Sequence, residues 1–144
     1  MPCTTHTIRI PDWNPTLLNK LLGSHWARAA RLKEMDKEIV SVMAYRQSVP
    51  KVKLVRGPDR IEGGKVYPGR LRKGTGPRRR VSLLIQLEAG QRRGDRDGYW
   101  KSVLDALVAC QRLVNDSPVW CEQGPVEFER TGRIGTIITL EDLA

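Results

Sequence analysis

The residues best suited to chemistry are acidic and fall in one short stretch, residues 94–116. Asp95 and Asp97 open the stretch, Lys101 follows one helical turn later, and Asp116 closes it. Two carboxylates about 4 Å apart repel each other by about 4 kcal/mol at an effective dielectric of ~20, so a protein that gathers them needs a cation. Oxygen-only ligands favour Mg²⁺ or Mn²⁺ over zinc. The residue types therefore predict a divalent metal site with Asp95, Asp97 and Asp116 as ligands.

The chain carries a net charge of +9, which favours a nucleic-acid partner, and a metal site on such a protein predicts phosphodiester hydrolysis. Such an ion activates water and neutralises the charge that builds on a scissile phosphate. We expect Lys101 to hold a phosphate oxygen or to stabilise transition-state charge. For Asp105, sequence position alone does not decide between a structural and a catalytic role. The other interpretation of the stretch is a plain amphipathic helix with an Asp97–Lys101 surface pair worth under ~0.5 kcal/mol.

The acidic stretch also carries the pattern of a half-buried helix. Its apolar residues recur at the i, i+3, i+4, i+7, i+8 spacing of a helix face: Trp100, Val103, Leu104, Leu107 and Val108. At about 100° per residue, Lys101 lies about 40° around from Asp97, and Asp105 about 40° further. The charged ridge therefore borders the buried stripe, which is where pKa values shift and metals bind.

The whole pattern resembles the RusA family of Holliday-junction resolvases. The family motif is D-x-D-N-x-x-K-x-x-x-D-A-L, with an acidic pair before a strand. The matching residues here are Asp95, Asp97, Lys101, the Asp105-Ala106-Leu107 triplet and Asp116. The resemblance covers about residues 92–119. We therefore identify the stretch as RusA-like.

Three positions depart from the family pattern. Gly98 stands where the family usually has Asn, and Asn115 replaces the first carboxylate of the acidic pair. Gly94 stands where an arginine often precedes the first Asp. None of these departures removes a carboxylate that the mechanism needs.

The resemblance implies a function and a substrate. RusA-like proteins are homodimers that cut four-way DNA junctions by symmetric paired nicks, using Mg²⁺ or Mn²⁺. The implied catalytic residues are Asp95, Asp97, Lys101 and Asp116. A two-fold protein suits a substrate of approximate two-fold symmetry. Two alternatives stay open: a non-catalytic nucleic-acid-binding module with a degenerate acidic site, and a nuclease of the same chemistry that acts on flaps or forks.

The length and composition favour one globular domain. A chain of 144 residues can bury a core of its own, and we expect a single RusA-like nuclease domain over residues 1–144. With 40% hydrophobic and 28% charged residues, the composition is globular and not disordered.

The net charge of +9 lies in one segment. Residues 51–80 hold eleven Lys and Arg against two acidic residues, so the remainder of the chain is neutral. The segment is rich in Gly and Pro and cannot bury enough apolar surface to order itself, although residues 65–67 could form a strand after the Gly63-Gly64 turn. We expect a flexible basic arm that follows phosphates and does not read bases. A merely solubilising loop is the other interpretation.

The residues expected to contact DNA are basic or amide side chains. They are Lys101, Arg78, Arg79, Arg80, Arg92, Arg93, Arg96, Asn19 and Lys20. Asn19-Lys20 resembles an Asn-basic pair that RusA-like proteins often carry soon after the first strand.

The cysteines and the hydropathy predict a cytoplasmic protein. Cys3, Cys110 and Cys121 are odd in number, lack C-x-x-C spacing and follow no signal peptide, which predicts reduced thiols. His6 and His25 have no partners at ligand spacing, so zinc is not expected. No apolar run approaches the ~20 residues of a membrane span, and we expect no membrane partner. The resemblance adds a nucleoid-associated location in a bacterial or phage-like setting.

The remaining elements complete an α+β domain. Strands are predicted at residues 4–10, 81–87, 126–130 and 134–140, with the second of these central in the sheet. The last two should form a hairpin through the turn at residues 131–133. The order β-α-β-α-β-β then gives two helices on a mixed sheet, with the long basic loop between the first helix and the second strand.

The region of the first helix should contain two helical pieces. The first should start at Asn14-Pro15 and end near Gly23. Ser24 should cap a longer piece that reaches about residue 45 or 47. The apolar residues expected on its buried side are Trp26, Ala30, Ile39 and Met43.

Overall fold

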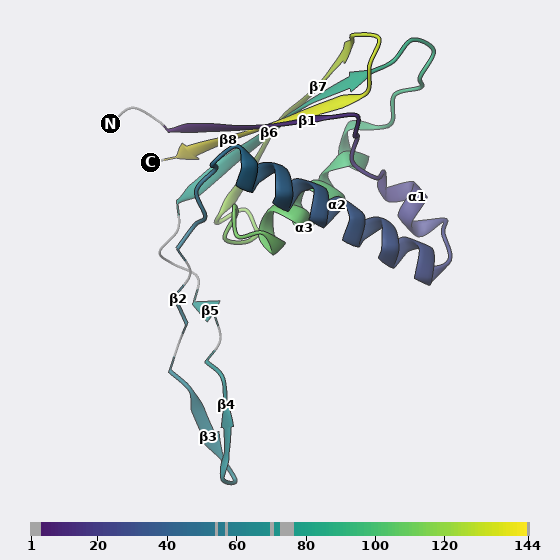
Figure 1. Cartoon of the computed structure of the whole chain (residues 1–144). Coiled ribbons are helices and arrows are strands. Elements are labelled where there is room, and N and C mark those ends of the chain that lie inside the picture. The colour runs from purple at the N-terminus through teal and green to yellow at the C-terminus, as the bar shows by residue number, and fades with distance from the viewer. Residues whose placement is uncertain (1–3, 54, 57, 70, 73–76, 144) are drawn as a thin grey trace.

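The computed structural model describes residues 4–53, 55–56, 58–69, 71–72 and 77–143. These residues form an α+β fold in which helices lie against a mixed sheet of four strands, and a narrow arm projects from this body (Figure 1). The predicted α+β class and mixed sheet are confirmed. The elements are β1 (Thr5–Pro11), α1 (Leu18–Leu22), α2 (Trp26–Arg46), β2 (Val55–Arg56), β3 (Arg60–Glu62), β4 (Lys65–Tyr67), β5 (Leu71–Arg72), β6 (Arg78–Leu87), the 3-10 helix η1 (Arg96–Tyr99), α3 (Trp100–Ala109), β7 (Cys121–Arg130) and β8 (Gly135–Leu143).

The strand β6 is central in the sheet, as its apolar sequence predicts. The strand order is β1-β8-β6-β7, and β6 runs antiparallel to β8 and parallel to β7. Every second residue of β6 from Arg79 to Leu87 is buried. That apolar face needs a covered position between two neighbours, because an edge strand would leave part of it in water.

The predicted hairpin of β7 and β8 is wrong, because β6 lies between them. The turn itself is present, and Gly132 adopts the left-handed φ of +81° that it requires. After β7 the chain crosses the end of β6, where the Thr131 amide donates to the Leu87 carbonyl at 3.2 Å. Turn residues fix where a chain reverses, but the burial of β6 decides which strands pair.

The apolar stripe of the acidic stretch forms helix α3 as predicted. Trp100, Val103, Leu104 and Leu107 are buried, and Val108 packs against the core. The helix begins only at Trp100, because η1 precedes it. The two first carboxylates therefore lie before the regular helix and not on its first turn.

The segment before α1 is not helical, contrary to the predicted start at Asn14-Pro15. Helix α1 begins at Leu18. Asp36 of α2 is only 4% exposed, and its carboxylate accepts from the Trp13 indole at 3.0 Å and from the Thr16 amide at 3.1 Å. These two hydrogen bonds hold residues 13–16 against α2, so the chain cannot coil before Leu18.

Helix α2 starts one residue later than predicted and turns a different face to the core. Its N-cap is His25, whose ring accepts from the Ala27 amide at 3.4 Å, whereas the Ser24 hydroxyl donates to the Lys20 carbonyl at 2.6 Å. The buried residues of α2 are Asp36, Val40 and Ala44. Trp26 and Ala30, both predicted to be buried, are exposed, because the bonds of Asp36 set the rotation of the helix. Ile39 and Met43 do pack against the core.

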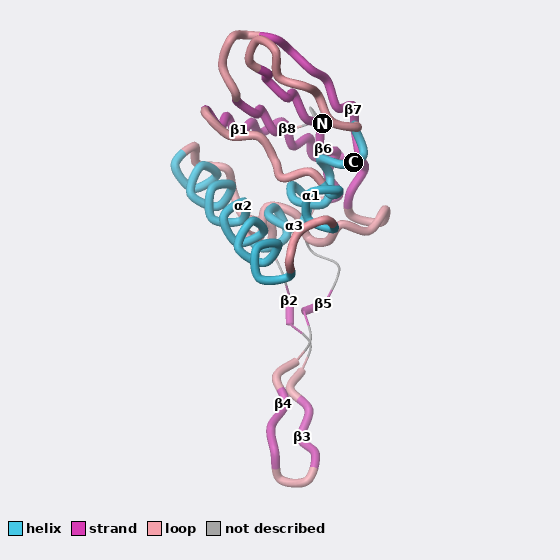
Figure 2. The backbone as a smooth tube through the Cα atoms, turned by 90° about the vertical axis from the view of Figure 1, so that its right-hand side faces the viewer, coloured by secondary structure: helices cyan, strands magenta, loops and turns pink. Residues whose placement is uncertain are grey.

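The arm contains two small antiparallel ladders, β2–β5 and β3–β4. Figures 1 and 2 both show the β3–β4 hairpin at the far end, away from the sheet and helices. The strand predicted at residues 65–67 is confirmed, although the segment as a whole was expected to be unordered. Predictions that concern Gly57, Arg70, Lys73, Gly74 and Gly76, and the thiol of Cys3, lie outside the described residues.

The other two cysteines, Cys110 and Cys121, are free and buried. Burial raises the pKa of the Cys121 thiol to about 11 and also raises that of Cys110. Among the described residues, no helix is long and apolar enough to cross a membrane.

Candidate active site

Asp95 and Asp97 open onto the same cavity. Both side chains are exposed, and they line a hollow of about 660 Å³. The other residues around this hollow, which we call the acidic cavity, are Leu17, Leu18, Asn19, Leu22, Arg96 and Gly98. The structure therefore brings together two predicted carboxylates with two predicted DNA contacts, Asn19 and Arg96.

Hydrogen bonds within residues 94–99 fix the loop that carries the two carboxylates. Asp95 is the extended N-cap of η1, and its carbonyl accepts from the Gly98 amide at 2.9 Å. The Gly94 amide donates to the hydroxyl of Tyr99, a buried residue, at 3.0 Å. A buried tyrosine thus anchors the peptide next to Asp95, while the carboxylates themselves stay in solvent.

Helix α1 forms the opposite wall of the acidic cavity. A Cβ atom built on Gly94 would lie 2.6 Å from Leu17 Cδ2, and one built on Gly98 would lie 3.3 Å from the same atom. The Ser102 hydroxyl of α3 also donates to the Thr16 carbonyl at 2.8 Å. The two glycines therefore let α1 pack closely on the acidic loop. This explains Gly98, which departs from the Asn of the RusA-like pattern.

Sequence reasoning missed the apolar side of the cavity. Leu17, Leu18 and Leu22 line it, and Leu22 is 78% exposed, whereas the sequence predicted only that a short helical piece runs through them. The signal in the sequence is the shortness of α1 between Pro15 and Gly23. A five-residue helix buries only Leu21 and leaves its other leucines to the surface.

Lys101 forms an ion pair with Asp105 and not with Asp97. Lys101 Nζ lies 3.2 Å from Asp105 Oδ2, one turn along α3, and 49% of the lysine side chain is exposed. The pair stabilises the helix by a few tenths of a kcal/mol, about 0.2–0.5. Lys101 can exchange such a partner for a phosphate at little cost.

Asp116 lies at a different place from Asp95 and Asp97. It is exposed and lines a second hollow of about 280 Å³ with Lys37, Asp105, Val108 and Ala109. The Asn115 side chain accepts from the Ser117 amide at 2.9 Å and so shapes the turn that presents Asp116. Burial is the main cause of the raised pKa of the Cys121 thiol, and the negative charge of Asp116 raises it further. The two side chains are therefore close to each other.

The three predicted metal ligands therefore do not form one cluster within the chain. Among the residues that the structure describes, no group of three His, Cys, Asp or Glu side chains could hold a metal ion. The pair Asp95 and Asp97 still fits Mg²⁺, which typically uses one or two carboxylates and keeps several waters.

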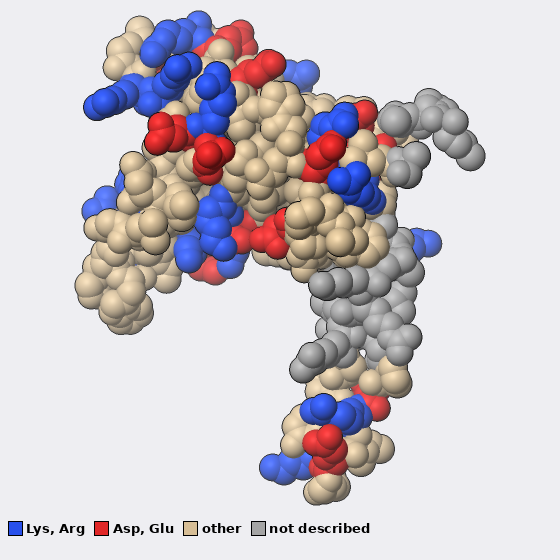
Figure 3. Space-filling view, turned by 180° about the vertical axis from the view of Figure 1, so that it is seen from behind, with Lys and Arg blue, Asp and Glu red and all other residues tan. Residues whose placement is uncertain are grey.

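Of the arginines before α3, Arg96 lines the acidic cavity, and Arg93 shares its contact with Phe128. Arg93 and Arg96 lie over the ring of Phe128, with guanidinium carbons 5.3 and 5.4 Å from its centre, and Arg96 Nε donates to the Val126 carbonyl at 3.0 Å. Arg92 is exposed beside them. Figure 3 shows Lys and Arg side chains at the upper end of the body, where β7 and β8 turn, with Asp and Glu side chains among them.

Arg79 and Arg80, predicted to contact DNA, are used within the fold. Arg79 is 2% exposed, and its guanidinium pairs with Asp142 at 2.7 Å and donates to the Arg112 carbonyl at 2.6 Å. Its place in the proposed DNA contacts is therefore corrected to a structural one.

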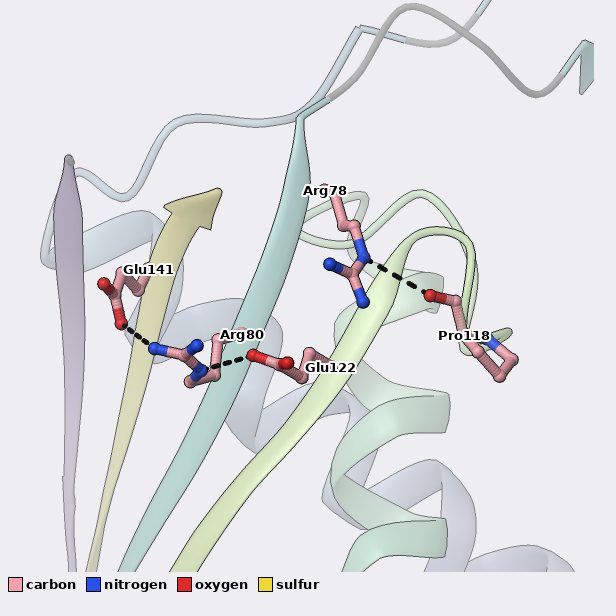
Figure 4. Close-up of polar contacts among 5 residues, drawn as sticks. All are labelled: Arg78, Arg80, Pro118, Glu122 and Glu141. Carbon is pink, nitrogen blue, oxygen red and sulfur yellow. Dashed lines mark hydrogen bonds and ion pairs between the residues drawn. The ribbon is translucent and has the colours of Figure 1, made fainter. Parts of the chain in front are cut away.

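Arg80 and Arg78 lie at the start of the same strand (Figure 4). Arg80 is held between Glu122 and Glu141, whose hydrogen bonds and charges raise its pKa. Arg78 is exposed and donates to the Pro118 carbonyl at 3.3 Å. Of the three arginines, Arg78 alone keeps a charge that no described carboxylate matches.

No protein-family model matches this chain, and no curated protein matches it significantly.

Proposed function

We propose that the protein is a Mg²⁺- or Mn²⁺-dependent endodeoxyribonuclease whose reaction takes place at the acidic cavity. The observation that carries the proposal is the pair Asp95 and Asp97, both exposed on one hollow that an arginine and an asparagine share. Two carboxylates without a cation would repel each other, and the arginine of the cavity suits a polyanion.

The proposed roles fall to four residues of the cavity and to Lys101 of α3. Asp95 and Asp97 would hold the ion, which when bound supplies Lewis-acid stabilisation and a water of lowered pKa. Arg96 and Asn19 contact phosphate oxygens beside the scissile bond. Lys101 leaves Asp105 for the phosphate and stabilises charge in the transition state.

The proposed substrate is branched DNA, foremost a four-way junction cut by paired nicks. Support comes from the RusA-like spacing of Asp95, Asp97, Lys101 and Asp116 and from the net charge of +9. The proposal includes a homodimer, a nucleoid-associated site of action in the cytoplasm, and the core order β-α-β-α-β-β interrupted by the basic segment 51–80. Within one chain Asp116 opens on a separate hollow. It completes the site only where a second copy brings it to Asp95 and Asp97.

A second candidate is a nucleic-acid-binding module without catalysis. The separation of Asp116 from the other two carboxylates favours it, because a degenerate site needs no shared cation. The basic arm and the arginines around Phe128 would then carry the whole function.

Cleavage of four-way junction, fork, flap and duplex DNA tests these proposals. We expect cutting with Mg²⁺ or Mn²⁺ and none with EDTA or Ca²⁺, because Ca²⁺ takes looser coordination and does not align water and phosphate. Asp95→Asn and Asp97→Asn should each lower the cleavage rate at least ~100-fold while metal-free binding persists. Asp12→Asn is the matched control, since Asp12 is exposed and outside the cavity. Efficient cutting in excess EDTA would overturn the metal-dependent proposal.

A further inference from the structure

The far end of the arm is a regular two-stranded hairpin. Its register pairs Arg60 with Tyr67, Ile61 with Val66, and Glu62 with Lys65. Gly63 and Gly64 form the two-residue turn with φ of +56° and +76°, both in the left-handed region that such hairpin turns use. The tip thus has defined faces and is not a shapeless loop.

The two faces of the hairpin differ in chemistry. Side chains alternate along a strand, so Ile61 and Val66 share one face, and they are 72% and 64% exposed. On the other face Arg60 lies over the ring of Tyr67 at 5.3 Å and pairs with Glu62 at 3.4 Å. The side chains of the polar face make contacts with one another, whereas the apolar side chains of the other face are exposed to water.

Charge changes sharply along the arm. The tip, residues 58–69, has two basic and two acidic residues and is neutral. The flanking residues, 51–57 and 70–80, have nine basic residues and no acidic one. A neutral apolar tip on a strongly basic stalk fits a partner that is a polyanion with uncharged flat surfaces, and a second copy of the same stalk would be repelled.

We propose that the Ile61 and Val66 face is a wedge that packs on unstacked bases at a DNA branch point, with the stalk along the adjacent phosphates. This inference rests on the proposed function, since it names how branched DNA is selected. Apolar side chains of architectural DNA-binding proteins insert between base steps, and unstacking the bases costs free energy. That cost is smaller where stacking is already interrupted, and base faces there accept any apolar surface. Duplex DNA offers the stalk its phosphates but offers the wedge no base face.

Fluorescence of 2-aminopurine at the branch point of a four-way junction tests the wedge, in EDTA and at saturating protein. Wild-type protein should raise the emission several-fold, and a probe in the middle of a junction arm should not respond. Ile61→Thr/Val66→Thr keeps both β-branched shapes but makes the face polar. It should abolish the rise and weaken junction binding about 10-fold, the equivalent of one lost base contact, with duplex binding unchanged. The matched control is Met35→Gln/Val42→Thr on α2, where both side chains are also exposed, and it should behave as wild type.

The outcomes separate the wedge from the nuclease. An equal rise in the Ile61→Thr/Val66→Thr protein, or an equal response of the mid-arm probe, overturns the wedge. A double variant that loses self-association in sedimentation, with junction and duplex binding weakened alike, assigns the face to a second copy and also overturns it. Absence of Mg²⁺-dependent cutting by wild-type protein that still raises the branch-point emission refutes the nuclease and leaves the wedge standing.

Discussion

At the level of single residues, the groups of the proposed reaction lie in two places, the acidic cavity and the exposed side of helix α3. Asp95 and Asp97 are exposed at the cavity, whereas Lys101 and Asp105 pair along the helix. An exposed i,i+4 pair contributes about 0.2–0.5 kcal/mol, so breaking the Lys101–Asp105 pair costs helix α3 little. Lys101 therefore has a charge available for a phosphate, and its removal should affect rate more than folding.

We predict that Lys101→Ala lowers single-turnover cleavage by about 100-fold, because charge in the transition state is concentrated at the reacting phosphate. Junction affinity should change little, since one contact among many contributes little binding. Asp105→Ala breaks the same ion pair from its other end and serves as the control. If both variants lose the same activity, the pair acts through the helix and Lys101 is not a catalytic group.

At the level of elements, periodic burial was predictable and strand pairing was not. The stripe from Trp100 to Leu107 gives α3 directly, and the alternation of residues 81–87 gives a central strand. The hairpin of β7 and β8 failed because the turn at Gly132 is a local signal, whereas the choice of neighbour depends on β6, far away in sequence. The prediction of the buried face of α2 was wrong for a similar reason. The hydrogen bonds from Trp13 and Thr16 to Asp36 set that face, and they produce no periodic pattern of apolar residues in the sequence.

The candidate site also has features that the sequence predicted and features that it did not. The sequence predicted one site for Asp95, Asp97 and Asp116, and only the first two line the same cavity. The wall that α1 adds could not be predicted, because it depends on the close approach of Leu17 to two glycines. Arg79 looked like one of three equivalent cations, but burial against Asp142 makes it structural.

The contact between α1 and the acidic loop predicts an order of effects. Gly94→Ala should destabilise the protein by under about 1 kcal/mol and lower cleavage, because the new methyl would lie 2.6 Å from Leu17 Cδ2 and the end of the leucine side chain must turn away from the cavity wall. Gly98→Ala should cost less, because its contact is 3.3 Å. Thermal unfolding and single-turnover cleavage measure both. Leu17→Ala in the Gly94→Ala background should recover part of the lost activity, and a Gly98→Ala protein that is the weaker of the two would contradict the contact.

The arm predicts a loss of salt dependence. Replacing residues 57–76 by a short Gly-Ser linker removes Arg60, Lys65, Arg70, Arg72 and Lys73. Losing three or four phosphate contacts should flatten the log–log dependence of junction affinity on salt by roughly three units. Fluorescence anisotropy across a salt series measures the slope, and the melting temperature should not fall, since the arm projects from the body (Figure 2). An unchanged slope at low salt would show that the arm is only a solubilising loop.

At the level of the whole molecule, the charges and the carboxylates are distributed over separate regions. All of the excess positive charge belongs to residues 51–80, and the remainder of the chain is neutral. Asp95 and Asp97 face one hollow, and Asp116 faces another. A site with all three carboxylates would therefore need a second chain to bring Asp116 to Asp95 and Asp97, an arrangement that the proposed homodimer on a two-fold junction would allow.

Mixing two inactive variants tests whether the site is shared between chains. Asp97→Asn and Asp116→Asn should each abolish cleavage alone, with junction binding unchanged or tighter, because each removes a negative charge that faces the DNA backbone. If Asp116 of one chain serves Asp95 and Asp97 of the other, a mixed dimer has one site with both defects and one intact site. Mixtures should then regain nicking of one strand, up to about a quarter of the wild-type site number for random exchange of chains. A mixture of wild type with an Asp97→Asn/Asp116→Asn chain reports how far the chains exchange. If all three ligands belonged to one chain, every site in the mixed dimer would carry a defect, and no mixture would cut although exchange is complete.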